Sequence, residues 1–168
     1  MYELVILSSQ LFKRVLFPKK LVFYKGLSWL VGPGGSGKTT IINLLKDYKF
    51  YFRRGEVACT LSLVHCEILK IDFLSCICSD EILSTMFDSF IQSTNSEDAR
   101  LKFLKYLLSQ VEANSHKLIL IDNALCMFGD VGAQKEALVI IEKIAKHVNV
   151  LASVNETSFP LSGQIFKI

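Results

Sequence analysis

Short apolar runs bounded by polar residues and glycines open the chain and predict β-strands. They lie at 4–7, 21–24 and 27–31, and the third ends at a glycine-rich loop. Apolar positions then recur at helical spacing over 39–45, 80–92, 99–111 and 133–147. Ser79 is the expected N-cap of the helix that begins at residue 80. Further strands are predicted over 55–64, 117–121, 148–154 and 164–168.

This alternation of strands and helices predicts an α/β fold with a mostly parallel central sheet. At 168 residues the chain fits one domain, so we expect a single unit over 1–168. Two of the predicted helices follow each other without a strand between them. They indicate a helical insert at about 65–115.

Composition narrows the class of protein. With 51% hydrophobic residues the chain is too apolar for a disordered tail, and its net charge of +3 indicates no basic stripe for nucleic acid. No apolar run reaches the roughly 18 residues that span a bilayer, and no secretory or transit signal is visible. Five cysteines without a CxxC pair indicate free thiols in a reducing compartment. The mean hydropathy of +0.37 indicates a surface that docks on an apolar partner.

The strongest chemical signal is the glycine-rich loop after the strand at 27–31. Its sequence fits GxxxxGK(S/T), the pattern of a phosphate-binding loop. Glycines let the backbone wrap closely around a phosphate, and the N–H groups of the loop and of the helix N-terminus point at the negative charge. Lys38 is expected to reach the β- and γ-phosphates. The predicted nucleotide-binding residues are Gly32, Pro33, Gly34, Gly35, Ser36, Gly37, Lys38, Thr39 and Thr40.

An acid at the end of a second apolar strand completes such a site. The run 118–121 is fully apolar and ends in Asp122. The expected Mg²⁺ ligands are therefore the Thr39 hydroxyl and Asp122, the latter through water. The sequence thus predicts a site for a nucleotide and Mg²⁺.

With these motifs the chain resembles the ATP-binding subunits of ABC transporters over most of its length. The matching segments are Lys25-Gly26, the phosphate loop, Arg54-Gly55-Glu56-Val57 and 163–168. Three further segments are similar to the haem-export ATPase of cytochrome c biogenesis, namely Leu16-Phe17, Leu21-Val22-Phe23 and 65–70. The resemblance implies ATP as the nucleotide, N-terminal antiparallel strands and a reduced helical subdomain.

Departures from the family pattern concern catalysis. Asn123 stands where the family has the Glu that acts as general base, and Asn155 where it has the switch His. Cys66 aligns with the glutamine of the Q-loop. Because the loss of a general base costs about 10²–10⁴ in rate, we expect ATP binding with weak or absent hydrolysis.

Two further family features are weakly represented. The signature motif aligns with 93–100, where only Glu97 and Arg100 are kept outright and the glycines are missing. The family also implies an aromatic side chain near the N-terminus that stacks on adenine, and Phe12 is the residue proposed for it.

The resemblance also implies partners and a place in the cell. A second ATP-binding subunit and integral membrane subunits would join the chain, without direct contact to nucleic acid. The chain would lie on the cytoplasmic face of a bacterial membrane or on the matrix face of the mitochondrial inner membrane. The cytochrome c branch implies haem export.

Other nucleotide-binding classes remain as alternatives. A small-molecule kinase needs lid arginines, and an AAA motor needs an arginine finger, but the chain has no Arg after Arg100. A DNA-repair ATPase of the RecF or SMC type would need coiled-coil arms or a basic stripe.

Overall fold

The architecture is that of helices packed around a mostly parallel sheet. The structure, a computed structural model, describes residues 2–6, 20–23, 26–46, 57–59, 68–93, 96–113, 116–126, 128, 130–155 and 159–168. In chain order the elements are β1 (Tyr2–Ile6), β2 (Lys20–Phe23), β3 (Leu27–Val31), α1 (Lys38–Lys46), β4 (Val57–Cys59), β5 (Ile68–Asp72), β6 (Ile77–Cys78), α3 (Glu81–Ser93), α4 (Ser96–Gln110), β7 (Leu118–Asp122), α5 (Val131–Ala145), β8 (Asn149–Val154) and β9 (Gln164–Lys167).

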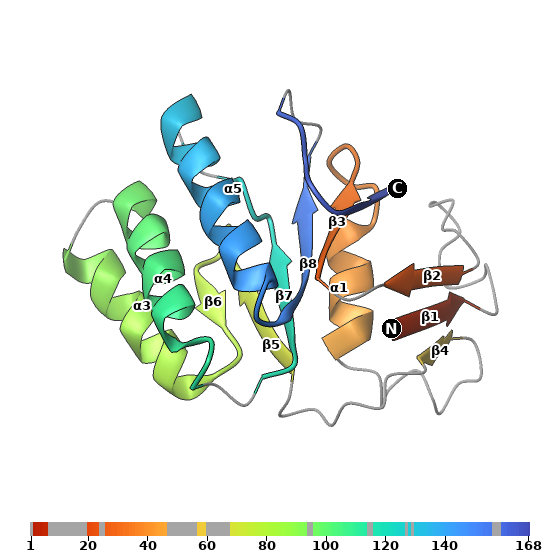
Figure 1. Ribbon diagram of the computed structural model, residues 1–168, viewed down its shortest axis with the longest axis horizontal. Helices are drawn as coiled ribbons and strands as arrows, with labels where there is room; N and C mark the ends of the chain where they lie inside the picture. Colours follow the sequence, from red (N-terminus) through yellow and green to blue (C-terminus); the bar gives the residue numbers. More distant parts are fainter. Residues whose placement is uncertain are drawn as a thin grey trace.

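The six-stranded sheet has the order β6-β5-β7-β8-β3-β9 (Figure 1). All neighbours are parallel except β5 and β6, which confirms the predicted α/β fold. Strand β8 lies between β3 and β7, and Asp72 at the end of β5 is in register with Asp122 at the end of β7. The carboxyl ends of the parallel strands therefore meet at one edge, where binding sites of open α/β sheets form.

Helices cover both faces of this sheet. Figure 1 shows α1 on one side and α3, α4 and α5 on the other. The central strand β7 is buried along its whole length, as its continuous apolar sequence predicts for a strand covered on both faces. In α5 the buried residues recur at helical spacing, among them Ala137, Ile141 and Ile144. The rings of Phe87 and Phe103 stack between α3 and α4 with centroids 4.2 Å apart.

A second, antiparallel sheet joins the strands near the N-terminus in the order β2-β1-β4. Tyr2 pairs with Phe23, and Leu4 pairs with both Leu21 and Cys59. This confirms the N-terminal antiparallel strands. Of the strand predicted over 55–64, only 57–59 lies within the described residues.

Strand β5 was not predicted, although it is the neighbour of β7 in the sheet. It lies inside the range 65–115 that was expected to hold the helical insert, whose helices are α3 and α4. Lys70 interrupts the apolar pattern of β5, so the sequence pattern did not indicate a strand there. In the structure the Lys70 ammonium donates to Asn43 Oδ1 of α1 (2.6 Å), so this inner strand accommodates a charged side chain.

The predicted N-cap of α3 was wrong by one residue. Asp80 Oδ1, not Ser79, accepts a hydrogen bond from the Leu83 N–H (3.0 Å), while Ser79 Oγ accepts one from the Lys70 N–H (2.9 Å). Both residue types cap helices well, but the Asp80 carboxylate also interacts favourably with the helix dipole. Ser79 therefore hydrogen-bonds to β5, and Asp80 caps α3.

Candidate functional site

The glycine-rich loop connects the carboxyl end of β3 to the N-terminus of α1. Gly35 and Gly37 have backbone φ angles of +76° and +96°, which residues with a side chain rarely adopt. At Gly32 a Cβ would collide with the backbone carbonyl of Ile168, which follows β9. The sequence therefore folds into a tight loop whose backbone lies next to the last strand, in the strand–loop–helix context of a phosphate-binding loop.

Lys38 is 94% buried at the start of α1, with 6% of its surface exposed. Its Nζ donates to the carbonyl oxygens of Gly32 (2.7 Å) and Pro33 (2.8 Å) and lies 3.4 Å from Ser36 Oγ. Burial lowers the pKa of Lys38, and attraction to the Asp122 carboxylate opposes that shift in part. The loop thus holds the ammonium group by its own carbonyls, at a point where a phosphate can take their place.

Asp122 ends β7 and is fully buried. Its Oδ1 accepts hydrogen bonds from the Ser153 hydroxyl of β8 and from the Asn123 N–H (3.1 Å). Its Oδ2 is buried without a hydrogen-bond partner among the described residues. A buried carboxylate oxygen without a hydrogen bond lowers the stability of the fold unless another group binds it. Coordination of Mg²⁺ would supply that group. Thr39, the other predicted ligand, is exposed on the first turn of α1.

Asn123, which the resemblance aligned with the general base, has left-handed backbone geometry with φ of +56°. Its N–H donates to Ser153 Oγ (2.9 Å), and its side-chain Nδ2 donates to Asp72 Oδ1 (3.1 Å). The amide is therefore held toward β5. Asn155, which the resemblance aligned with the switch His, follows β8 at the same edge of the sheet and is exposed.

Asp72 lies beside these residues at the end of β5, and the sequence alone did not single it out. Burial raises its pKa, but hydrogen bonds from Ser75, Asn123 and the Leu74 N–H outweigh that effect, so its pKa lies below the ordinary value. The carboxylate is thus ionised at neutral pH, beside Asn123. One signal could have found it: Ile71-Asp72 repeats the Ile121-Asp122 ending of the neighbouring strand.

Arg100, aligned with the signature motif by the resemblance, is not on the surface. It is buried, and its Nε donates to the Phe73 carbonyl (2.8 Å), while one terminal nitrogen lies 3.2 Å from Cys76 Sγ. It therefore ties α4 to the turn after β5. The side chain of Glu97 lies outside the described residues, as do Phe12 and Cys66.

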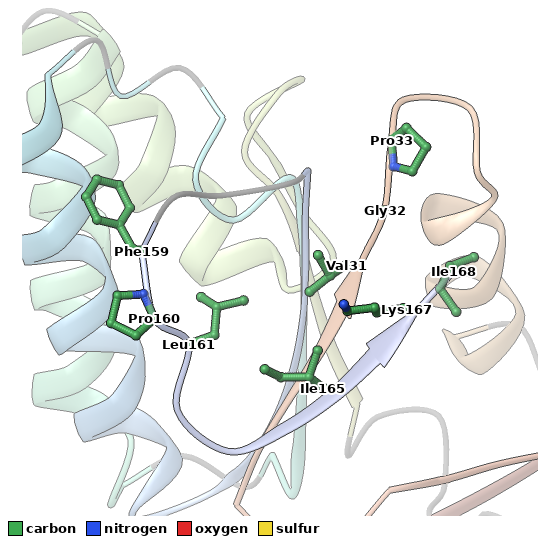
Figure 2. A pocket seen from close by; sticks show the side chains of 9 residues that line it. All are labelled: Val31, Gly32, Pro33, Phe159, Pro160, Leu161, Ile165, Lys167 and Ile168. Carbon is green, nitrogen blue, oxygen red and sulfur yellow. The ribbon is translucent and has the colours of Figure 1, made fainter.

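A pocket of about 560 Å³ adjoins the first residues of the phosphate loop. Figure 2 shows the segment 159–161 on one side of it, β3 and β9 on the other, and Pro33 at its upper end. Its lining side chains are apolar except for that of Lys167. Trp29 Nε1 donates to the Ser162 carbonyl (2.8 Å) and so joins the end of that segment to β3.

Comparisons with known proteins bear on the fold alone. No family model matches the sequence, and no curated protein matches it either. Among solved structures, a candidate ABC transporter ATP-binding protein from Pyrococcus furiosus has a TM-score of 0.64 at 14% identity, over 99% of this chain and 96% of its own. Caenorhabditis elegans PCH-2 reaches only 0.41 at 20% identity, over 83% of this chain and 32% of its own, which is too low to carry an argument. The chain therefore has an α/β fold like that of an ABC-type ATPase.

Proposed function

We propose that this chain is the ATP-binding subunit of an ABC transporter-like membrane complex, with weak or absent hydrolysis of its own. It would bind Mg·ATP through Gly32–Thr40 and Asp122. The ABC-type domain would span 1–168, with α3 and α4 as its helical insert. Two such subunits would face each other on the membrane partners.

The observation that carries this proposal is that two buried charged side chains, Lys38 and Asp122, lie close enough for the carboxylate to influence the pKa of the lysine. A phosphate-binding loop supplies a buried ammonium group, and the next strand but one supplies a buried carboxylate with an unpartnered oxygen. Glycine loops alone occur in many turns. A loop, a lysine and an acid that converge at one sheet edge favour a nucleotide triphosphate with its metal.

Each residue would have a distinct role at this site. The loop N–H groups and Lys38 would hold the β- and γ-phosphates, and Thr39 and Asp122 would hold Mg²⁺. The ion supplies charge neutralisation between those phosphates. Asn123 cannot accept a proton at neutral pH, so attack by water would lack its base. ATP binding would then drive subunit closure without fast turnover, because binding energy alone shifts a conformational equilibrium.

Two variants with matched controls test nucleotide binding by titration calorimetry. Lys38→Ala should weaken Mg·ATP binding at least tenfold, and Asp122→Asn should remove the dependence of affinity on Mg²⁺. Lys102→Ala and Asp88→Asn make the same changes at exposed helix positions and should do neither. Equal affinity in Lys38→Ala and the parent chain would refute the site.

Hydrolysis is tested separately from binding. Phosphate release by the isolated chain should stay near that of Lys38→Ala. A clear turnover that disappears in Lys38→Ala would contradict the proposed loss of the base while leaving the binding site intact.

The membrane assignment and the haem branch need their own test. Within the described residues, no helix has the length and apolar character to cross a membrane. The proposed place is therefore peripheral, on the cytoplasmic face of a bacterial membrane or the matrix face of the mitochondrial inner membrane. The similarity of 16–17, 21–23 and 65–70 to the haem-export ATPase supports a role in cytochrome c maturation.

A tagged pull-down from detergent-solubilised membranes, with mass spectrometry and a haem absorbance scan, separates the possibilities. Integral membrane proteins with bound haem are the expected result. Other membrane proteins would remove the haem branch alone. An eluate with DNA and no membrane protein would replace the proposal by the RecF- or SMC-type alternative.

A further inference from the structure

We propose that Ser153, the buried serine near the end of β8, is the positioning residue for Asp122. Its hydroxyl group holds one carboxylate oxygen of Asp122 and leaves the other oxygen for Mg²⁺. This inference rests on the proposed nucleotide and metal site. It gives a role to a residue on a third strand, in addition to the glycine-rich loop after β3 and the acid at the end of β7.

Ser153 lies between the two halves of the candidate site. In the sheet, β8 has β3 on one side and β7 on the other. Ser153 is in register with Leu30, close to the end of β3 and to the loop that follows it. On the other side the ladder pairs Ala152 with Ile121, so the next residues, Ser153 and Asp122, face each other. A side chain at position 153 can therefore reach the carboxylate from the strand that also borders the loop.

The serine is an exception in its strand. Residues 150–154 of β8 are all buried, and the other four have apolar side chains. Ser153 itself is 0% exposed. A hydroxyl group moved from water into such surroundings costs free energy unless it is hydrogen-bonded. Ser153 therefore needs partners, and those it has are the two residues at the end of β7.

The groups around the hydroxyl fix the direction of its hydrogen bonds. The Asn123 N–H donates to Ser153 Oγ (2.9 Å), and because an N–H group can only donate, the oxygen is the acceptor there. The single hydroxyl proton of Ser153 is left for Asp122 Oδ1, to which it donates. The Asn123 N–H also donates to Oδ1 (3.1 Å). Asp122 Oδ1 thus has two donors, whereas Oδ2 has none among the described residues.

This difference between the two oxygens orients the carboxylate. A rotation of the Asp122 carboxylate away from its present position would break both hydrogen bonds to Oδ1, so Oδ2 keeps its direction. The removal of a side chain that holds a metal ligand in this way typically lowers metal affinity about 10–100-fold. The Ser153 backbone adds a second contact, because its carbonyl accepts a hydrogen bond from the Ala124 N–H (2.8 Å). Ser153 therefore holds both the acid and the chain just after it.

Removal of the hydroxyl group tests this role. Titration calorimetry gives the ratio of the affinity for Mg·ATP to the affinity for ATP in EDTA. In Ser153→Ala we expect that ratio to fall about tenfold or more, while the affinity in EDTA stays within about twofold of the parent chain. Ser153→Thr keeps the hydroxyl group and should restore most of the ratio. Ser153→Cys fills the space with a weaker donor, so it should lower the ratio in part, and it serves if thermal melts show that Ser153→Ala does not fold.

Ser28→Ala is the matched control. Ser28 is also a buried serine of an inner strand, 2% exposed, but its hydroxyl group donates to Gln164 Oε1 of β9 (3.4 Å). Its removal should lower Tm, as Ser153→Ala does, and should leave the ratio unchanged. If Ser153 only stabilised the sheet, the two variants would behave alike.

A double substitution shows whether Ser153 acts through Asp122. In Asp122→Asn chains, Ser153→Ala should change the ratio no further, because the carboxylate that it positions is absent. An unchanged ratio in Ser153→Ala, a loss that Ser153→Thr does not restore, or an equal loss in Ser28→Ala would overturn the inference. Each of these results leaves the proposed site in place as long as Asp122→Asn removes the metal dependence. If the parent chain binds ATP neither with Mg²⁺ nor without it, the proposed function fails together with the inference.

Discussion

Replacing Asn123 by Asp tests whether the amide at this position is required by Asp72. A carboxylate at position 123 would resemble the glutamate that the family uses as general base more closely than the amide does. Asp also tolerates the left-handed backbone at φ of +56°. The substitution also converts a hydrogen bond between Asn123 Nδ2 and Asp72 Oδ1 into a contact between two carboxylates. We expect the variant to lose stability without gaining hydrolysis.

The magnitude follows from the 3.1 Å between the two groups. A hydrogen bond to a charged group contributes about 1.5–3 kcal/mol. Two charges at this separation repel by about 1.3 kcal/mol in bulk water and about 5 kcal/mol at an effective dielectric constant of 20. Because both side chains are half-buried and screened by water, we take the lower end of each range. The total is about 3 kcal/mol, or roughly 6–12 °C in Tm for a chain of this size.

Thermal melts across pH give the assay. Repulsion raises the pKa of the new carboxyl in the folded state, so the loss is complete above that raised pKa and shrinks as pH falls through it. Asn123→Gly removes the hydrogen bond without adding charge and should show no such dependence. The exchange of both residues, Asp72→Asn with Asn123→Asp, restores the pair and should recover most of the Tm. An Asn123→Asp chain as stable as Asn123→Gly at pH 8 would refute the reasoning.

Three further substitutions, the last with a matched control, test other parts of the structure. Burial lowers the pKa of His116, with the Lys46 charge acting in the same direction and Asp80 opposing it. Its folded pKa thus lies below its unfolded one, so stability should fall as pH drops below about 6.5, and His116→Gln should flatten that slope in melts from pH 8 to 5. Arg100→Met leaves the Phe73 carbonyl without its donor and should cost about 1–3 kcal/mol, with faster hydrogen exchange over 73–76. Gly32→Ala should lower Tm and abolish Mg·ATP binding because its Cβ collides with Ile168, whereas Gly34→Ala, with open space around it, should keep the parent Tm.

Much of the fold was predictable because local pattern and tertiary role agree. Strand β7 is apolar up to Asp122 and β3 is apolar except for Ser28, and burial on both faces favours that pattern. Strand β5 was hidden because Lys70 finds its partner, Asn43, on a helix 27 positions away in sequence. No window of neighbouring residues contains that information.

The candidate site shows the same contrast between features visible in local sequence and features that depend on distant residues. The glycine-rich loop and Asp122 could each be singled out from the sequence because each belongs to a short run of neighbouring residues, and their binding of nucleotide and metal stays a prediction. Asp72 was missed because it joins the site through strand register, 51 positions from Asn123. The burial of Arg100 likewise depends on the turn that α4 meets.

The position of β3 between β8 and β9 has a consequence for synthesis of the chain. The strand that carries the phosphate loop is made early, but both of its neighbours come from the last part of the chain, and 133 positions separate Trp29 from Ser162. At about 5–20 residues per second, β3 waits roughly 7–27 s for its partners. During that time its backbone edges and the Trp29 indole have no native cover, so the nascent chain is open to aggregation and to chaperones. The proposed nucleotide site is complete only later, because Asp122 reaches the loop once β8 has inserted between β3 and β7.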